Sequence, residues 1–257
     1  MPTQPPIPAT SPITSLTSPN SSTLPNPPVP SERTTTGGVI HAYNKSIAHF
    51  VIYTTHDEYL RCIAMMLYYQ FENPGQSFSR LLRDAPRKTP PTEASHDPRG
   101  KPDPLATAID AVRGKTRRAL LIAYCLMPTH IHLILEEIRP GAVKDCMSDL
   151  ENAYARYFNI KHERKGPLWQ GRFKRSGIFS DRELLNVTRY VHLNPATSYL
   201  VNDPGAWPYS SFHEHTRQTG LPGICSWEHR MTVVPEEYGR FVRDYVETQR
   251  ALARERK

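Results

Sequence analysis

The hydrophobic and polar positions along the chain predict three strands after residue 37. The first is expected at residues 38–44 and ends in a polar turn at residues 44–46. The second, at residues 119–127, is an unbroken apolar run, which is typical of a strand covered on both faces. The third is expected at residues 130–136, directly after the turn residues Pro128 and Thr129.

Three other segments have the 3.6-residue period of amphipathic helices. The first helix is expected to begin at Thr55, because a glutamate three residues later completes a capping box. The second covers about residues 143–157. The third opens with another capping box at Ser180 and is expected to end near Asn194, because Pro195 follows.

This order of elements predicts a small α+β domain with an antiparallel sheet, at residues 38–213. Residues 74–104 are rich in Pro, Ser, Asp and Arg and are predicted to form an insertion with at most one short helix, at residues 78–83. Residues 1–37 are predicted to be a disordered leader, because the first thirty combine ten prolines with ten Ser and Thr and carry no charge. Residues 214–257 are expected to form a helical or partly ordered tail.

The composition narrows the class of protein without identifying it. The formal net charge of +7 suits a polyanionic partner, but many basic proteins bind no nucleic acid. No run approaches the roughly 18 apolar residues of a membrane span. The leader lacks the basic start and apolar run of a secretory signal. The four cysteines form no CxxC pair, so we expect reduced, mostly buried thiols and a cytoplasmic protein. If its polyanionic partner is DNA, the protein would be associated with the nucleoid when bound.

His130 and His132 are the first candidate site residues. They are two positions apart in a predicted strand, so both side chains leave the same face of the sheet. Two imidazoles placed in this way can chelate a divalent cation and leave coordination positions open for substrate oxygens. The alternative is a pair of polar residues at the start of a strand, because a bare His-x-His pattern is weak evidence.

Tyr190 and Asn194 are the second pair of candidates, one turn apart on the same face of a predicted helix. A tyrosine can attack phosphorus when a metal ion polarises the phosphate and the phenol is deprotonated. The alternatives are a half-buried helix tyrosine and an asparagine that caps the helix before a proline.

Residues 161–175 form the third candidate, a basic segment with two aromatic side chains. Such a segment can neutralise phosphates while its aromatic rings stack on unpaired bases. In that case not every cation would face the DNA, because Arg172 is expected to hold the loop. The alternative is a solvated basic turn anchored by its tryptophan. The candidate DNA-binding residues are Lys161, Arg164, Lys165, Trp169, Arg172, Lys174 and Arg175.

Five motifs along the chain resemble the motifs of one enzyme family. Residues 124–135, with two histidines around one hydrophobic residue, resemble the metal-site strand of the HUH single-tyrosine transposases. Gly-Pro-Leu-Trp-Gln-Gly-Arg-Phe-Lys at 166–174 resembles a motif of the REP-associated tyrosine transposase branch, and Arg-Tyr-Val-His-Leu-Asn-Pro at 189–195 resembles its nucleophile motif. Residues 41–45 resemble its first strand, with lysine where arginine is common. Residues 207–211 resemble its closing aromatic-Ser-Ser motif.

The resemblance implies a ferredoxin-like α+β fold, with an antiparallel sheet, helices packed on one face and a metal site on the sheet. It implies Mg²⁺ or Mn²⁺ bound by His130, His132 and Asn194, and Tyr190 as the nucleophile that forms a 5′-phosphotyrosine link with single-stranded or hairpin DNA. A monomer and a homodimer are both compatible with it. Two alternatives remain open, a repeat-processing nuclease with the same chemistry and a domesticated, catalytically reduced DNA-binding protein that recognises palindromic repeats.

Overall fold

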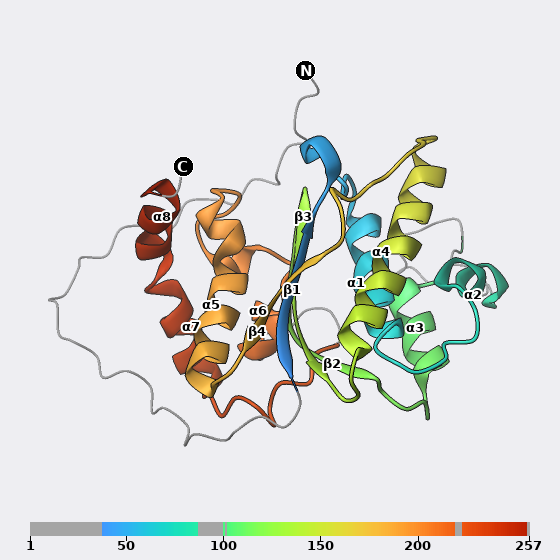
Figure 1. Ribbon diagram of the computed structural model, residues 1–257. Helices are drawn as coiled ribbons and strands as arrows, with labels where there is room; N and C mark the ends of the chain where they lie inside the picture. Colours follow the sequence, from blue (N-terminus) through green and yellow to red (C-terminus); the bar gives the residue numbers. More distant parts are fainter. Residues whose placement is uncertain (1–37, 87–99, 101, 219–222, 256–257) are drawn as a thin grey trace, which may run out of the picture.

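The computed structural model describes residues 38–86, 100, 102–218 and 223–255. The leader predicted to be disordered, at residues 1–37, lies outside the described residues, as does part of the predicted insertion. In Figure 1 the sheet is seen edge-on between two layers of helices.

Four strands form one sheet in the order β2-β3-β1-β4, and every neighbouring pair is antiparallel. The helix α1 (His56–Tyr68) lies between the first two strands in the chain, and α4 (Ala142–Lys161) lies between the last two. This strand-helix-strand-strand-helix-strand order is the ferredoxin-like arrangement. The predicted α+β class and antiparallel sheet are confirmed. The strands are β1 (Val39–Lys45), β2 (Ala119–Met127), β3 (His130–Glu137) and β4 (Lys174–Ile178).

Alternate residues of the central strands enter two separate hydrophobic cores. In β3, Ile131 and Leu133 belong to the core under α1 and α4. Ile134, on the opposite face, belongs to the second core, which includes Leu184 and Val191 from the helix α5 (Asp181–Thr197). The residues at 130 and 132 share the face of Ile134, because side chains alternate along a strand.

The first layer contains α1 and α4 and also the short helices α2 (Phe78–Asp84) and α3 (Pro104–Val112). The helix predicted at residues 78–83 is confirmed as α2. The helix α3 was not predicted. The Asp103 side chain caps it by accepting from the backbone N–H of Leu105 at 2.8 Å.

The predicted layer of helices on one face is present, and helices also cover the second face. The second layer contains α5 and the C-terminal helices α7 (Pro235–Arg243) and α8 (Val246–Glu255) (Figure 1). The reason is visible in β2, whose apolar side chains point to both faces and must be buried on both. Three short elements complete the fold: η1 (Ile47–His49), η2 (Pro204–Ala206) and α6 (Phe212–His215).

The helix α5 continues through Pro195 to Thr197, although the sequence predicts its end near Asn194. Proline lacks the N–H that would bond the carbonyl group of Val191, four residues earlier. The Asn194 side-chain amide donates to this carbonyl at 3.3 Å and to the Tyr190 carbonyl at 2.9 Å. This substitute donor accounts for the tolerated proline.

The strand β4 is not predicted by the sequence, which indicates a basic loop up to residue 175. Its sequence, Lys-Arg-Ser-Gly-Ile, has no strand-like hydrophobic pattern, and its first four residues are exposed. Pairing with β1 makes it a strand at the edge of the sheet. Charged side chains are common on edge strands because they oppose pairing with other chains.

The buried thiols predicted from the sequence are confirmed for three cysteines, and Cys225 is partly exposed. Within the described ranges, each helix is too short or too polar to cross a bilayer.

Candidate functional site

His130 and His132 lie side by side on the face of β3 that α5 covers. Their ring centroids are 5.2 Å apart, with the rings nearly perpendicular. His132 is buried at 5% exposure, and His130 is partly exposed. The shared face expected from their spacing is therefore observed.

Tyr190 projects from α5 toward this pair. Its ring centroid lies 5.8 Å from that of His132, in an edge-to-face arrangement. The tyrosine is 37% exposed, so its ring is reachable from solvent although it contacts the sheet. The fold thus brings together the strand and helix candidates that are far apart in the sequence.

A third histidine, His41 on β1, completes the cluster. A hydrogen bond joins His41 Nε2 and His132 Nδ1 at 3.0 Å, and the His41 ring lies 6.1 Å from the ring of Tyr190. His130 Nδ1 is likewise hydrogen-bonded to Thr129 Oγ1 at 3.0 Å. These hydrogen bonds use Nδ1 of both His130 and His132, so Nε2 is the ring nitrogen that each could offer to a metal ion. The sequence includes His41 in the motif of the first strand but does not indicate its role, because a single histidine in a strand does not reveal its neighbour across the sheet.

Burial keeps the three imidazoles neutral at neutral pH. It lowers the pKa of His41 to about 4. Burial, with the positive charge of Lys45 and the nearby His49, lowers the pKa of His130 to about 4. The pKa of His132 is well below its ordinary value, through burial first and then through the other histidines and Lys45. A metal ion requires the neutral form of histidine, so these rings are in the state needed for ligation.

The donor set for a metal ion would be small. In the part of the chain that the structure describes, no group of three or more His, Cys, Asp or Glu side chains is arranged to hold a metal ion. Asn194 is buried on α5 one turn after Tyr190, and its amide nitrogen is engaged with the helix carbonyls. Two imidazoles would leave most coordination positions for substrate or solvent oxygens.

Two of the basic candidates make protein contacts at the far end of α4. Lys161 Nζ lies 2.8 Å from the carboxylate of Glu58, which is fully buried. Arg164 donates to Asn159 Oδ1 at 3.1 Å and to the Pro167 carbonyl at 2.8 Å. The charged groups of Lys161 and Arg164 are therefore engaged in contacts within the protein at this end of α4. Lys165 and Arg172 are exposed.

Trp169 anchors the segment that leads to β4. It is partly buried against the first core, and its indole N–H donates to the Glu151 carbonyl at 3.0 Å. The Asn44 side chain donates to the Gly171 carbonyl at 3.0 Å. Trp169 and Asn44 thus provide contacts that hold this loop, and Arg172 is exposed.

Lys174 and Arg175 lie on opposite faces of β4, although the sequence grouped them as one DNA-binding pair. Lys174 is opposite Tyr43 of β1, and Arg175 is opposite Ala42. Ala42 belongs to the core under α1 and α4, so Arg175 is on that side of the sheet and Lys174 is on the side of Tyr190.

The closing motif at residues 207–211 fastens α5 to the sheet. Ser211 Oγ accepts from the backbone N–H of Tyr124 on β2 at 2.8 Å and lies 2.8 Å from His192 Nε2 on α5. The Trp207 indole N–H donates to the Leu126 carbonyl at 3.0 Å. These buried bonds hold the helix that carries Tyr190 at a set position above β2 and β3.

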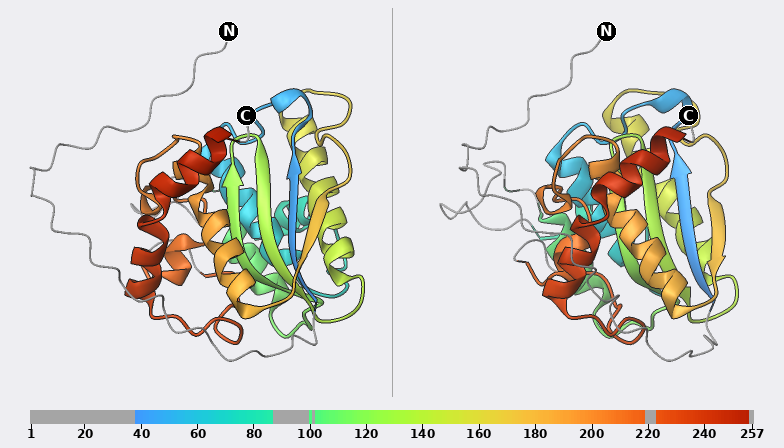
Figure 2. Two further views of the ribbon diagram at one scale, coloured as in Figure 1. Left: turned by 60° about the vertical axis from the view of Figure 1, so that its left-hand side comes forward. Right: turned by 90° about the vertical axis from the view of Figure 1, so that its left-hand side faces the viewer.

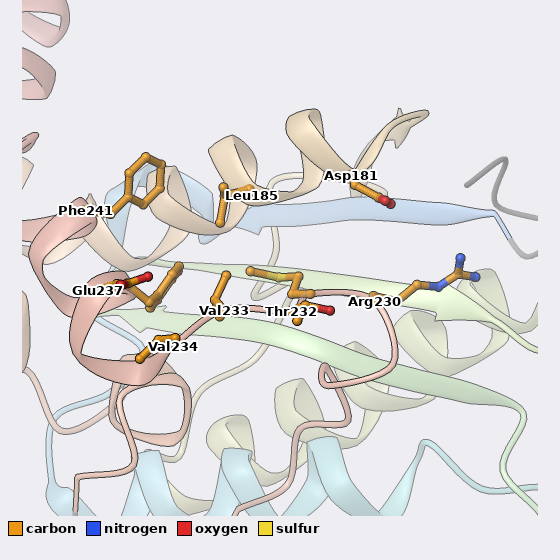
Figure 3. A pocket seen from close by; sticks show the side chains of 10 residues that line it. Asp181, Leu185, Arg230, Thr232, Val233, Val234, Glu237 and Phe241 are labelled. Atoms are coloured by element: carbon orange, nitrogen blue, oxygen red, sulfur yellow. The ribbon is translucent and has the colours of Figure 1, made fainter. Parts of the chain in front are cut away.

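A cavity of about 260 Å³ also borders α5, away from the histidines. Figure 3 shows Leu185 of α5 and Phe241 of α7 on its walls, with Val233 on the connecting segment. Asp181 and Arg230 lie toward one end. Neither the histidines nor Tyr190 line it, so it is separate from the candidate site.

Comparison with known proteins shows which sequences a segment of this chain is similar to. Residues 106–194 match the model of the family described as "Transposase IS200 like". This segment contains His130, His132, Tyr190 and Asn194. The resemblance to single-tyrosine transposases that the motifs predict is confirmed over this segment.

A more particular similarity follows from one relative. The chain is 31% identical over 111 residues to a protein of Haemophilus influenzae named "Putative REP-associated tyrosine transposase". The aligned region is 39% of this chain and 63% of the relative, so the chain spans less than two thirds of that protein. A solved REP-associated tyrosine transposase bound to a REP hairpin aligns with 79% of this chain and 96% of its own, at 16% identity and a TM-score of 0.43.

Proposed function

We propose that this chain cleaves and rejoins single-stranded DNA, with Tyr190 as the nucleophile. The observation that carries the proposal is the position of Tyr190, whose ring lies 5.8 Å from that of His132 in the histidine cluster. The similarity of residues 106–194 to IS200-like transposases supports the same activity.

The residues fit a divalent cation, for which Mg²⁺ or Mn²⁺ is the proposed choice. His130 and His132 are neutral and would offer Nε2, and Asn194 would add an amide oxygen. When bound, the cation would polarise the scissile phosphate. His41 is a positioning residue here, because its hydrogen bond holds His132 in one ring orientation.

In the proposed reaction the Tyr190 oxygen attacks phosphorus and releases its proton. The bond from phosphorus to the 3′ oxygen breaks, and that oxygen takes up a proton. The products are a 5′-phosphotyrosine link and a free 3′-OH. Attack by another 3′-OH reverses the step, so rejoining needs no ATP, because the phosphodiester energy is retained in the covalent link.

The proposed substrate is a DNA hairpin with an adjoining single-stranded segment. The resemblance of the motifs to the REP-associated tyrosine transposases implies this substrate, and the Haemophilus influenzae relative is named as REP-associated. The formal net charge of +7 favours a polyanionic partner.

The direct test is Tyr190→Phe, assayed for covalent protein–DNA adduct on a denaturing gel with labelled hairpin DNA and Mn²⁺. The adduct should disappear while hairpin binding is retained, because only one hydroxyl is removed. Tyr43, whose ring lies 5.7 Å from that of His132, is the first alternative nucleophile if the adduct persists. Tyr154 is a poor alternative because it is fully buried among residues of the other core.

The cation requirement is tested with His130→Ala, His132→Ala and a chelator. Each should abolish adduct formation and leave DNA binding in place, because the site has only two strong protein ligands and the loss of one would weaken it severely. Full activity in excess chelator would rule out the metal assignment. Hairpin binding by the wild-type protein without any adduct would instead select the alternative of a DNA-binding protein that has lost catalysis.

A further inference from the structure

One row of side chains crosses the sheet from its open edge to the histidine cluster. Lys174 of β4 lies opposite Tyr43 of β1, and Tyr43 lies opposite His132 of β3. Residues directly opposite each other in antiparallel strands have side chains on the same face. The Tyr43 ring is stacked on that of His132 at 5.7 Å, which places this row on the side of Tyr190.

Two further polar residues extend the row into a strip. Lys45 lies opposite His130, and its charge helps to lower the pKa of that histidine. Ser176 lies opposite His41. We call Lys45, Tyr43, Ser176 and Lys174 the β1–β4 strip.

The strip is accessible. Lys45, Ser176 and Lys174 are exposed, and Tyr43 is partly exposed. The helix α5 packs mainly on β2 and β3, and the right-hand view of Figure 2 shows β1 and β4 beyond the edge of the helical layer. With the residues that the structure describes, neither lysine forms an ion pair. Both positive charges are therefore available to an anion.

Three of the other basic candidates do not share this position. Arg175 is exposed on the other face of the same strand, while Lys161 and Arg164 are engaged at the end of α4. The fold thus separates two adjacent cations, Lys174 and Arg175, by which face of the sheet they occupy.

We propose that the β1–β4 strip binds the backbone of the single-stranded DNA segment that leads to Tyr190. This inference rests on the proposed function and adds the path of the strand, which enters over the open β1–β4 edge. Lys174 and Lys45 contact phosphates, and Ser176 lies two residues beyond Lys174 along the same edge strand, opposite His41. Such contacts are independent of base sequence.

The test compares Lys174→Gln with Arg175→Gln, two single-charge changes at neighbouring exposed positions. Both are made in the Tyr190→Phe protein, so binding is measured without cleavage. The ligand is a hairpin with a single-stranded flank, and affinity is measured over a series of salt concentrations. Lys174→Gln should reduce the log–log salt slope by about 0.7, the value for one single-strand phosphate contact, and Arg175→Gln should leave it unchanged. Lys45→Gln should behave like Lys174→Gln.

A hairpin without the flank provides the second measurement, because the difference between the lysine and arginine variants should vanish on it. Equal salt slopes for Lys174→Gln and Arg175→Gln on the flanked hairpin would refute the proposed role of the β1–β4 strip, whether both slopes are reduced or both are unchanged. The failure of the proposed function is distinct: the wild-type protein would form no adduct, whereas the salt slopes would still report whether the strip holds DNA. Melting temperatures of both variants should match the parent, because the side chains are exposed.

Discussion

Replacing Trp169 by alanine separates a structural role of this residue from base stacking. The ring is partly buried against the core under α1 and α4, and its N–H donates to the Glu151 carbonyl at 3.0 Å. The neighbouring residue Gln170 donates its backbone N–H to the Lys45 carbonyl at 2.9 Å, so the anchor lies next to the strand that carries the β1–β4 strip. We expect Trp169→Ala to lower stability before it affects DNA binding directly.

The magnitude follows from the burial and the hydrogen bond. Truncation of a fully buried tryptophan costs about 3–5 kcal/mol, and a partly buried ring costs less, so we expect about 2–3 kcal/mol. For a protein of this size the melting temperature should fall by about 4–12 °C, at roughly 2–4 °C per kcal/mol. Trp169→Phe keeps most of the apolar contact and loses the N–H, so it should cost about 1 kcal/mol.

The assay is thermal unfolding by circular dichroism, paired with single-strand binding at a temperature where every variant is folded. Phe179→Ala is the matched aromatic control, because Phe179 is 81% exposed and its loss should leave the melting temperature nearly unchanged. An unchanged melting temperature for Trp169→Ala, with about 1–3 kcal/mol of binding lost, would refute the reasoning and identify the ring as a stacking platform.

Three further predictions concern buried polar groups. Burial lowers the pKa of His215 to about 4, so the unfolded chain, with a histidine pKa of about 6.5, takes up a proton that the folded chain excludes. The stability contributed by neutral His215 is thus full above pH 6.5 and is lost as the pH falls toward 4. Between pH 7 and 5, the free energy of unfolding measured in urea should therefore fall by about 2 kcal/mol less in His215→Phe than in the wild type. His41→Ala should weaken Mn²⁺ binding by about 10-fold or more in calorimetry without DNA, and an unchanged affinity would remove its positioning role. Asn194→Ala should lower the free energy of unfolding by about 1 kcal/mol. The loss should be smaller in a Pro195→Ala background, because residue 195 then has an N–H for the helix. Strictly additive losses of stability in a double-mutant cycle would contradict this account.

Local patterns in the sequence were sufficient for the features that depend on neighbours in the chain. The shared face of His130 and His132 follows from the two-residue repeat of a strand, and the start of α5 follows from the capping box, in which Ser180 Oγ accepts from the Glu183 N–H at 3.2 Å. The relation of Tyr190 to Asn194 follows in the same way from the helical repeat. The motifs also indicated the family that the comparison of residues 106–194 supports.

Only the tertiary structure decided which distant residues meet. The pairing of β1 with β3 brings His41 to His132, and the pairing of β1 with β4 turns a charged segment into an edge strand. That register assigns Lys174 to the face of Tyr190 and Arg175 to the opposite face, although the two are adjacent and similar in charge. Strand register is a long-range property, set by which surfaces exclude water together, and the periodicity of one segment does not identify its partner strand.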